Sequence, residues 1–290
     1  MFMKGLFLLF ALAVLPGLLS AKLVKADLSE AIKNRSVSLE AVNTEGRYKG
    51  KTTKLRITNT EKFVQQITVN LGVILKPDDT GAQPMVLAGG EDIIIPAGDS
   101  REIMVMTFCG NSPRSCPSKN SRYSYWRVGS DTLVKVLEFI KANSIYNIMG
   151  QDAVWVITNH HSVSNVYQEG NPEMVKKFVD LLCKLTGQPQ PDFHTVMPEH
   201  EVAGQPAYVP KALKIIATFE VRLDSPKTLT LGVFNDAGEM IQKVFIDQEF
   251  GRSGHRFEVE FESADVAPGH YYIRLKEHDT VLQQKMVMVE

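Results

Sequence analysis

The 290-residue sequence lacks a bias toward charge of either sign, since 32 Lys and Arg stand against 33 Asp and Glu. The net charge of −1 argues against a partner such as nucleic acid or an anionic membrane, because proteins that bind these carry a basic excess. None of the seven histidines stands at a metal-ligand spacing from a carboxylate or cysteine, and no glycine-rich loop of the phosphate-binding kind is present. We therefore expect no nucleic acid, metal or cofactor.

Long apolar runs are also missing, except at the N-terminus. Lys4 precedes an uninterrupted apolar segment from Gly5 to Leu15, Pro16-Gly17 breaks it, and Ala21 offers a small residue at the expected cleavage point. These are the parts of a secretory signal peptide, which we predict over residues 1–21. This run is too short for a comfortable membrane span, and we find no longer one after it. We expect an exported mature chain with no transmembrane segment after signal removal.

After the predicted signal peptide, the apolar residues show two kinds of spacing. Apolar, β-branched segments separated by Gly, Pro, Asp and Asn predict a β-rich region over residues 36–109. The spacing of apolar residues in 131–142 is typical of an amphipathic helix. A second helix is predicted within 171–187, where Asn is the cap, Pro holds the first helical position and Gly ends the helix. We predict that residues 22–187 form an α+β domain, β-rich with packed helices.

The last hundred residues differ in composition. Residues 188–212 contain five prolines and little periodicity, which predicts an extended, semi-rigid linker. In residues 213–290, apolar and polar residues alternate in short runs, as they do from Ile215 to Leu223. Turn sequences rich in Gly, Asn, Asp and Pro separate these runs. The pattern predicts a C-terminal all-β sandwich built from short antiparallel strands.

The sandwich region also has a more particular pattern. The stretches "TLTLGVFNDAGEMIQKVF" and "SGHRFEVEFESADVAPGHYYIRL" are followed by a basic and apolar ending, "QKMVMVE". In this order they resemble the C-terminal sorting domain of type IX secretion cargo, which is related to the Ig-like domain of flagellar hook-capping proteins. The resemblance covers the last quarter of the chain. It implies an Ig-like fold, the type IX secretion machinery as a partner, and delivery through the periplasm to the outer cell surface or medium.

A second resemblance concerns Cys109, at the end of a predicted strand, and Gln151, which lies 42 residues further on. The element "FC" followed by "GQDAVWVITN" resembles the thioester domains of bacterial surface adhesins over roughly residues 36–170. In those domains a cysteine sulfur and a glutamine side chain are joined, with loss of ammonia, into an internal thioester. The resemblance implies that Cys109 is the sulfur partner and Gln151 the acyl partner.

A thioester is an activated acyl group that an amine or hydroxyl attacks, so it survives only where water is excluded. The resemblance assigns this shelter to Phe108, Val154 and Trp155. The segment that follows Gly150 reads equally well as one or two helical turns or as a strand. The partner that bears the nucleophile is an unknown surface protein or glycan. We therefore favour a secreted binding or adhesion protein over an enzyme.

Three alternatives stay open. Cys116 lies seven residues after Cys109 across a loop that contains proline, so the two could form a local disulfide. Cys109, His161 and Asn159 could instead make a secreted cysteine-dependent hydrolase, although no sequence signature fixes their geometry. A non-catalytic structural protein of the envelope keeps the same fold. The third cysteine, Cys183, is expected to be a buried, inert thiol on a helix.

Overall fold

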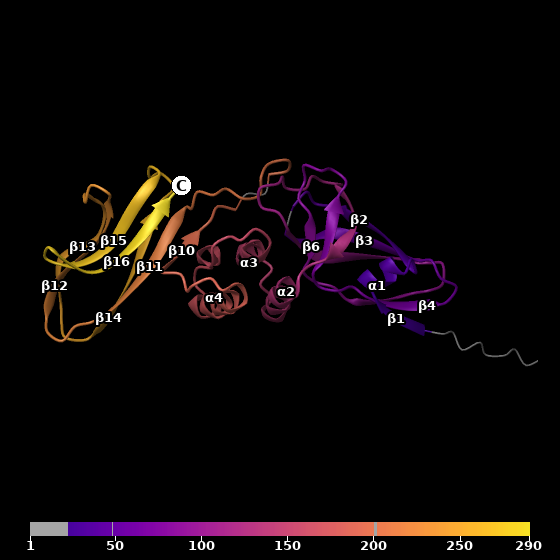
Figure 1. Cartoon of the computed structure of the whole chain (residues 1–290), viewed down its shortest axis with the longest axis horizontal. Helices are drawn as coiled ribbons and strands as arrows, with labels where there is room; N and C mark the ends of the chain where they lie inside the picture. Colours follow the sequence, from indigo (N-terminus) through magenta and orange to yellow (C-terminus); the bar gives the residue numbers. More distant parts are fainter. Residues whose placement is uncertain (1–22, 48, 200–201) are drawn as a thin grey trace, which may run out of the picture.

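A computed structural model describes residues 23–47, 49–199 and 202–290. The predicted signal peptide, residues 1–21, lies outside the described residues. A β-barrel stands at one end of the molecule, a layer of helices in the middle and a pair of β-sheets at the other end (Figure 1). The predicted α+β class is confirmed. Over the described ranges, helices of the length and apolarity that a membrane span needs do not occur.

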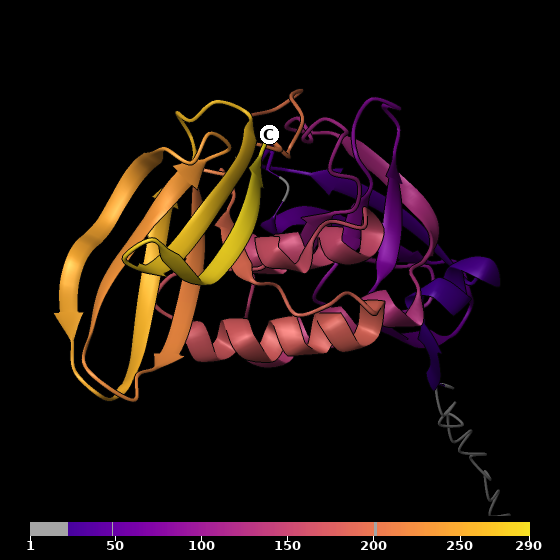
Figure 2. The same ribbon diagram turned by 60° about the vertical axis from the view of Figure 1, so that its left-hand side comes forward.

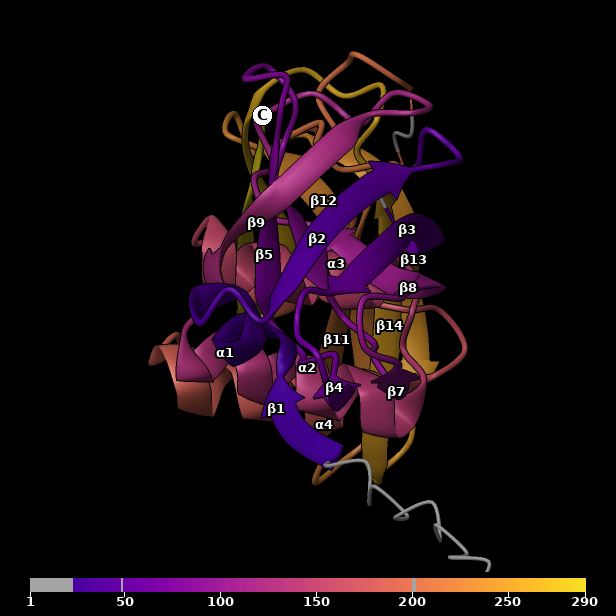
Figure 3. The ribbon, with the colours of Figure 1, turned by 90° about the vertical axis from the view of Figure 1, so that its right-hand side faces the viewer.

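Six strands close into the barrel in the order β2-β3-β8-β6-β5-β9, and every neighbouring pair is antiparallel. Figure 3 looks onto this barrel. The bounds of the strands are β2 (Val37–Asn43), β3 (Gly50–Asn59), β5 (Val73–Pro77), β6 (Met85–Leu87), β8 (Ser100–Cys109) and β9 (Arg122–Val128). Leu55, Leu75 and Met85 fill the interior and are fully buried. The barrel thus accounts for most of the predicted β-rich region, and β9 closes it from beyond that region.

A small sheet adjoins the barrel and shares its core. It has the order β1-β4-β7, with β1 (Leu23–Asp27) parallel to β4 (Val64–Thr68) and β4 antiparallel to β7 (Asp92–Ile95). Helix α1 (Leu28–Lys33) follows β1 directly. Its Leu28 is fully buried in the same apolar cluster as the barrel interior.

Three longer helices lie between the barrel and the C-terminal sheets (Figure 2). Helices α2 (Asp131–Asn143) and α4 (Pro172–Thr186) confirm the two predicted helices, and α3 (Ile148–Thr158) and a short 3₁₀ helix η1 (Val163–Asn165) stand between them. The local signals act as expected. The Asn171 side chain accepts a hydrogen bond from Met174 N, and Gly187 adopts a left-handed φ of 74°. The helices bury a second apolar cluster against the outer side of the barrel.

Two antiparallel sheets make up the C-terminal part and share a third apolar cluster, in which Phe219, Leu231 and Ile273 are fully buried. Their orders are β10-β11-β14 and β13-β12-β15-β16. The strands are β10 (Phe193–Val196), β11 (Lys214–Arg222), β12 (Lys227–Asn235), β13 (Met240–Phe250), β14 (Gly254–Glu262), β15 (Gly269–Glu277) and β16 (Thr280–Val289).

The predicted linker, residues 188–212, is more structured than its proline content suggested. Strand β10 pairs with β11 and so belongs to the C-terminal sheets. Residues 202–208, here called the cover segment, pack on the barrel instead, where Cys116 N donates to Gln205 O at 2.7 Å. Proline has no backbone N–H to donate to a strand ladder. Strand β10 contains no proline, and the cover segment bonds to Cys116 through Gly204 N and Gln205 O. The predicted linker is therefore held in two places, by β10 on the C-terminal sheets and by the cover segment on the barrel.

Candidate functional site

Cys109 is the last residue of β8 and is fully buried. It pairs with Met85 of β6, and its side chain belongs to the apolar cluster of the barrel interior. The preceding residue, Phe108, points the opposite way, into the cluster beneath the helices, because successive side chains of a strand alternate. Cys109 therefore stands at the junction of the barrel and the helical layer.

Gln151 lies in the first turn of α3 and is also fully buried. Of the two conformations open for this segment, the helix is the one observed. The Asn147 side chain caps the helix by accepting a hydrogen bond from Gly150 N at 3.3 Å. A Cβ atom at Gly150 would lie 2.2 Å from the carbonyl oxygen of Ile145 and 3.0 Å from Phe108 Cζ. Glycine thus permits the close approach of α3 to β8.

The structure brings the two residues of the predicted thioester together. Cys109 N donates to Gln151 Oε1 at 2.9 Å, and Gln151 Nε2 donates to Cys109 O at 3.0 Å. This reciprocal pair fixes the side-chain amide of the glutamine against the residue that carries the sulfur. Each bond contributes about 1 kcal/mol net, and both stand in a region without solvent exposure. The amide carbon is therefore held beside Cys109 before any reaction.

The three predicted shelter residues are all buried, but on two sides of the site. Trp155, one turn after Gln151, shares the apolar cluster of Cys109 and is 1% exposed. The Tyr208 ring of the cover segment meets the Trp155 ring edge-on at 5.7 Å. Phe108 and Val154 belong instead to the apolar cluster beneath the helices. Only Trp155 stands on the sulfur side of the site.

Cys116 lies beneath the cover segment and is 2% exposed. Its backbone bonds to that segment in both directions, because Gly204 N also donates to Cys116 O at 3.3 Å. Burial, together with the nearby Cys109, Asp79 and Cys116, raises the pKa of the Tyr123 hydroxyl well above its usual value. Both cysteines thus lie near one barrel tyrosine, and the disulfide between them stays a prediction.

Two of the three residues of the hydrolase alternative, His161 and Asn159, bond to Ser112, which the sequence did not single out. The Ser112 hydroxyl and His161 Nε2 are 2.9 Å apart, and Ser112 N donates to Asn159 Oδ1 at 3.2 Å. Burial lowers the pKa of His161, so its ring favours the neutral form. These three residues and Tyr208 border an open hollow of about 510 Å³. Ser112 could have been noticed only through its place between the two cysteines.

Asp152 is a further residue that the sequence analysis missed. Its side chain is 2% exposed, and its Oδ1 atom has no hydrogen-bond partner within the described part of the chain. Burial raises its pKa well above the ordinary value, whereas Lys49 lowers it and Glu199 raises it further. Lys49 Nζ and Glu199 Oε2 form an ion pair at 2.8 Å. The available signal was an acidic residue inside the otherwise apolar segment "IMGQDAVWVIT".

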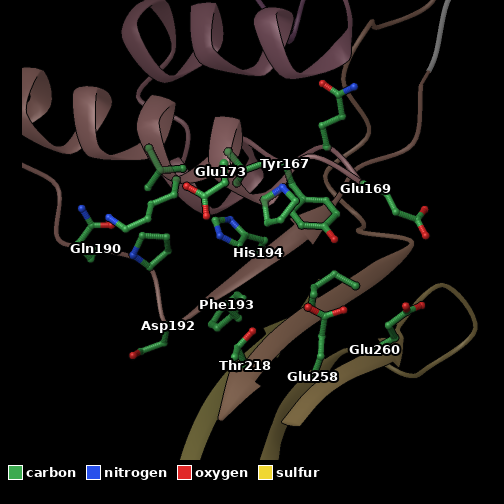
Figure 4. Close-up of a pocket in the computed structure, with 18 of the residues that line it drawn as sticks. Tyr167, Glu169, Glu173, Gln190, Asp192, Phe193, His194, Thr218, Glu258 and Glu260 are labelled. Atoms are coloured by element: carbon green, nitrogen blue, oxygen red, sulfur yellow. The ribbon is translucent and has the colours of Figure 1, made fainter. Parts of the chain in front are cut away.

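A second hollow, of about 530 Å³, lies between the start of α4 and the sheet of β10, β11 and β14 (Figure 4). Its wall is rich in carboxylates and also holds the rings of Tyr167 and His194, 5.4 Å apart. The carboxylates are Glu169, Glu173, Asp192, Glu258 and Glu260. In residues 23–47, 49–199 and 202–290, potential ligands do not gather into a group of three or more that could hold a metal ion.

Searches against protein-family models and against curated proteins find no match for this chain. The site is therefore defined by its own geometry. Its elements are a buried cysteine at the end of a barrel strand, a buried glutamine at the start of a helix, and the two hydrogen bonds that join them.

Proposed function

We propose that the protein is a secreted, cell-surface binding or adhesion protein that attaches to its partner through an internal thioester between Cys109 and Gln151. The observation that carries this proposal is the reciprocal pair of hydrogen bonds, at 2.9 and 3.0 Å, between the Gln151 amide and the Cys109 backbone. These bonds hold an acyl group and a thiol-bearing residue together inside the core. Such positioning removes most of the entropic cost of a reaction between them.

Bond formation balances without an added reactant. The Cys109 sulfur attacks the Gln151 side-chain carbonyl carbon, the bond from that carbon to Nε2 breaks, and the thiol proton leaves with the nitrogen as ammonia. A primary amine of the partner later attacks the same carbon. An amide then joins Gln151 to the partner, and Cys109 regains its thiol. The full burial of both residues keeps water from the thioester in the meantime.

The C-terminal sheets, residues 213–290, serve in this proposal as an Ig-like sorting domain for the type IX secretion machinery. Two features support this role. Strand β16 stands at the edge of its sheet, and its Met286 and Met288 are 57% and 62% exposed. Lys285 of the same strand is turned inward, where its Nζ donates to Asp192 O at 2.6 Å. The exposed methionines therefore offer an apolar contact surface on a strand that is firmly held.

The intact mass of the mature protein tests the thioester directly. We expect the wild-type protein to be lighter than its sequence by the mass of one ammonia molecule, and Cys109→Ala and Gln151→Ala to have their full sequence masses. A wild-type mass lower by two hydrogens, restored by Cys116→Ser, would establish the disulfide in place of the thioester. A full wild-type mass would leave the scaffold without a covalent role and favour an envelope structural protein.

A further inference from the structure

The core around Cys109 holds polar atoms that the described residues leave without hydrogen bonds. They are Gln83 Nε2, the Tyr123 hydroxyl oxygen and Asp152 Oδ1, on side chains that are 0%, 3% and 2% exposed. Each such atom costs about 1–3 kcal/mol when it is buried unpaired. Native proteins keep few of them, and each one calls for an explanation, of which a catalytic role is one. Of the three side chains, only Asp152 carries a carboxyl group, which can act as a base.

Asp152 follows Gln151 directly in the first turn of α3. Trp155 lies three residues after Asp152 and four after Gln151, so both side chains border the side of the helix that Trp155 occupies. Groups from three other segments interact electrostatically with Asp152: Lys49 from the β2–β3 connection, Glu199 before the cover segment, and Tyr208 within it. The ion pair of Lys49 with Glu199 shows that an ammonium group fits beside the Glu199 carboxylate. This surface favours a cationic nucleophile over a neutral hydroxyl.

We propose that Asp152 is the proton-transfer residue for acyl transfer at Gln151, and that the acceptor is a primary ammonium group such as a lysine side chain of the partner. This inference rests on the proposed thioester. The free oxygen of the Asp152 carboxylate receives the ammonium group and takes one of its protons. The resulting neutral amine attacks the carbonyl carbon of Gln151.

The remaining steps account for every proton. Attack by the amine breaks the bond between the carbonyl carbon and the sulfur, and Cys109 leaves as a thiolate. A second proton of the nitrogen passes to the thiolate, which gives the amide and the free thiol. Asp152 then returns its proton to solvent. Burial raises the pKa of the Asp152 carboxyl well above its ordinary value, which makes the carboxylate a stronger base than an exposed aspartate.

The rate of methylamine addition, followed by intact mass, tests the role of Asp152. In Asp152→Asn we expect the loss of ammonia to remain and the rate near neutral pH to fall by about 10²-fold to 10⁴-fold. Methoxyamine, which is uncharged at neutral pH, serves as the matched probe, and its rate should fall much less. Equal rates of wild type and Asp152→Asn with methylamine would overturn the proposal. So would a folded Asp152→Asn protein of full mass, because Asp152 would then act in forming the bond.

The wild-type protein offers a second test that needs no variant. If Asp152 deprotonates the ammonium, the methylamine rate reaches a plateau once the Asp152 carboxyl is ionised. If free amine attacks unaided, the rate instead climbs about tenfold per pH unit up to the pKa of methylamine, and the proposal fails. A wild-type protein without the ammonia loss would show that the thioester itself is absent, which separates the failure of the proposed function from the failure of this inference.

Discussion

Gly150 and Phe108 lie in direct contact where α3 meets β8: a Cβ atom on Gly150 would stand 3.0 Å from Phe108 Cζ. The same atom would stand 2.2 Å from the Ile145 carbonyl oxygen, which belongs to the backbone and cannot turn away. This close contact sets the distance between the helix that carries Gln151 and the strand that carries Cys109.

Gly150→Ala is therefore expected to push α3 away from β8. We predict a loss of about 1–3 kcal/mol in the free energy of unfolding, as is typical of overpacked cores. We also predict a smaller fraction of molecules that have lost ammonia. Urea unfolding and intact mass measure the two effects. Gly251→Ala is the control, because nothing lies within 4 Å of a Cβ atom there. Equal stability of both variants would contradict the prediction.

Cys109 should be protected from thiol reagents in the native protein and become labelled after methylamine opens the thioester. Gln151→Ala should expose the thiol without amine treatment. That variant should also lose about 1–3 kcal/mol of stability, because the Cys109 N–H and carbonyl would be left buried without their partner. Peptide mapping of the labelled protein locates the modified cysteine. Release of Cys109 by a reductant but not by methylamine would point to the disulfide with Cys116.

His161→Ala separates the adhesion proposal from the hydrolase alternative. His161 bonds to Ser112, so its removal should cost about 1 kcal/mol of stability and leave the methylamine reaction unchanged. Thermal unfolding and the rate of amine addition provide the two readouts. A hydrolase that relied on this imidazole would instead lose its reactivity at Cys109.

Removal of residues 213–290 should leave the barrel and helices folded, because the apolar cluster of the C-terminal sheets is separate from the other two clusters. Strand β10 would lose its partner β11 and become free. We expect the truncated protein to accumulate in the periplasm. Cell fractionation with surface labelling measures this distribution. Normal amounts of truncated protein at the cell surface would refute the type IX assignment.

The raised pKa of Asp152 predicts how stability depends on pH. The folded protein binds this proton more tightly than the unfolded chain does, so the contribution is full below the ordinary value of 3.8 and is lost as pH rises through the folded value. Each unit of difference is worth about 1.4 kcal/mol. Asp152→Asn should therefore raise the melting temperature at neutral pH and remove this decline. A variant that melts below wild type at pH 7 would contradict it.

The sequence by itself determined the elements whose signals are local. The Asn171 cap, the glycine at 187 and the apolar spacing between them predicted α4, because capping and helical amphipathicity depend on residues three or four apart. The alternation from Ile215 to Leu223 likewise predicted β11, and the alternating residues Ile215, Ala217 and Phe219 of that strand are buried. The motif resemblance singled out Cys109 and Gln151, which the structure joins by two hydrogen bonds, and the thioester between them stays a prediction.

Only the tertiary structure decided which distant groups meet. The hydrogen bonds between Cys109 and Gln151 span 42 residues and exist because Gly150 lets α3 approach the end of β8. The burial of Asp152, the bond of Ser112 with His161 and the pairing of β10 with β11 depend on the same kind of contact. Local sequence patterns do not encode such contacts, because the free energy that fixes them comes from packing segments that are far apart in the chain.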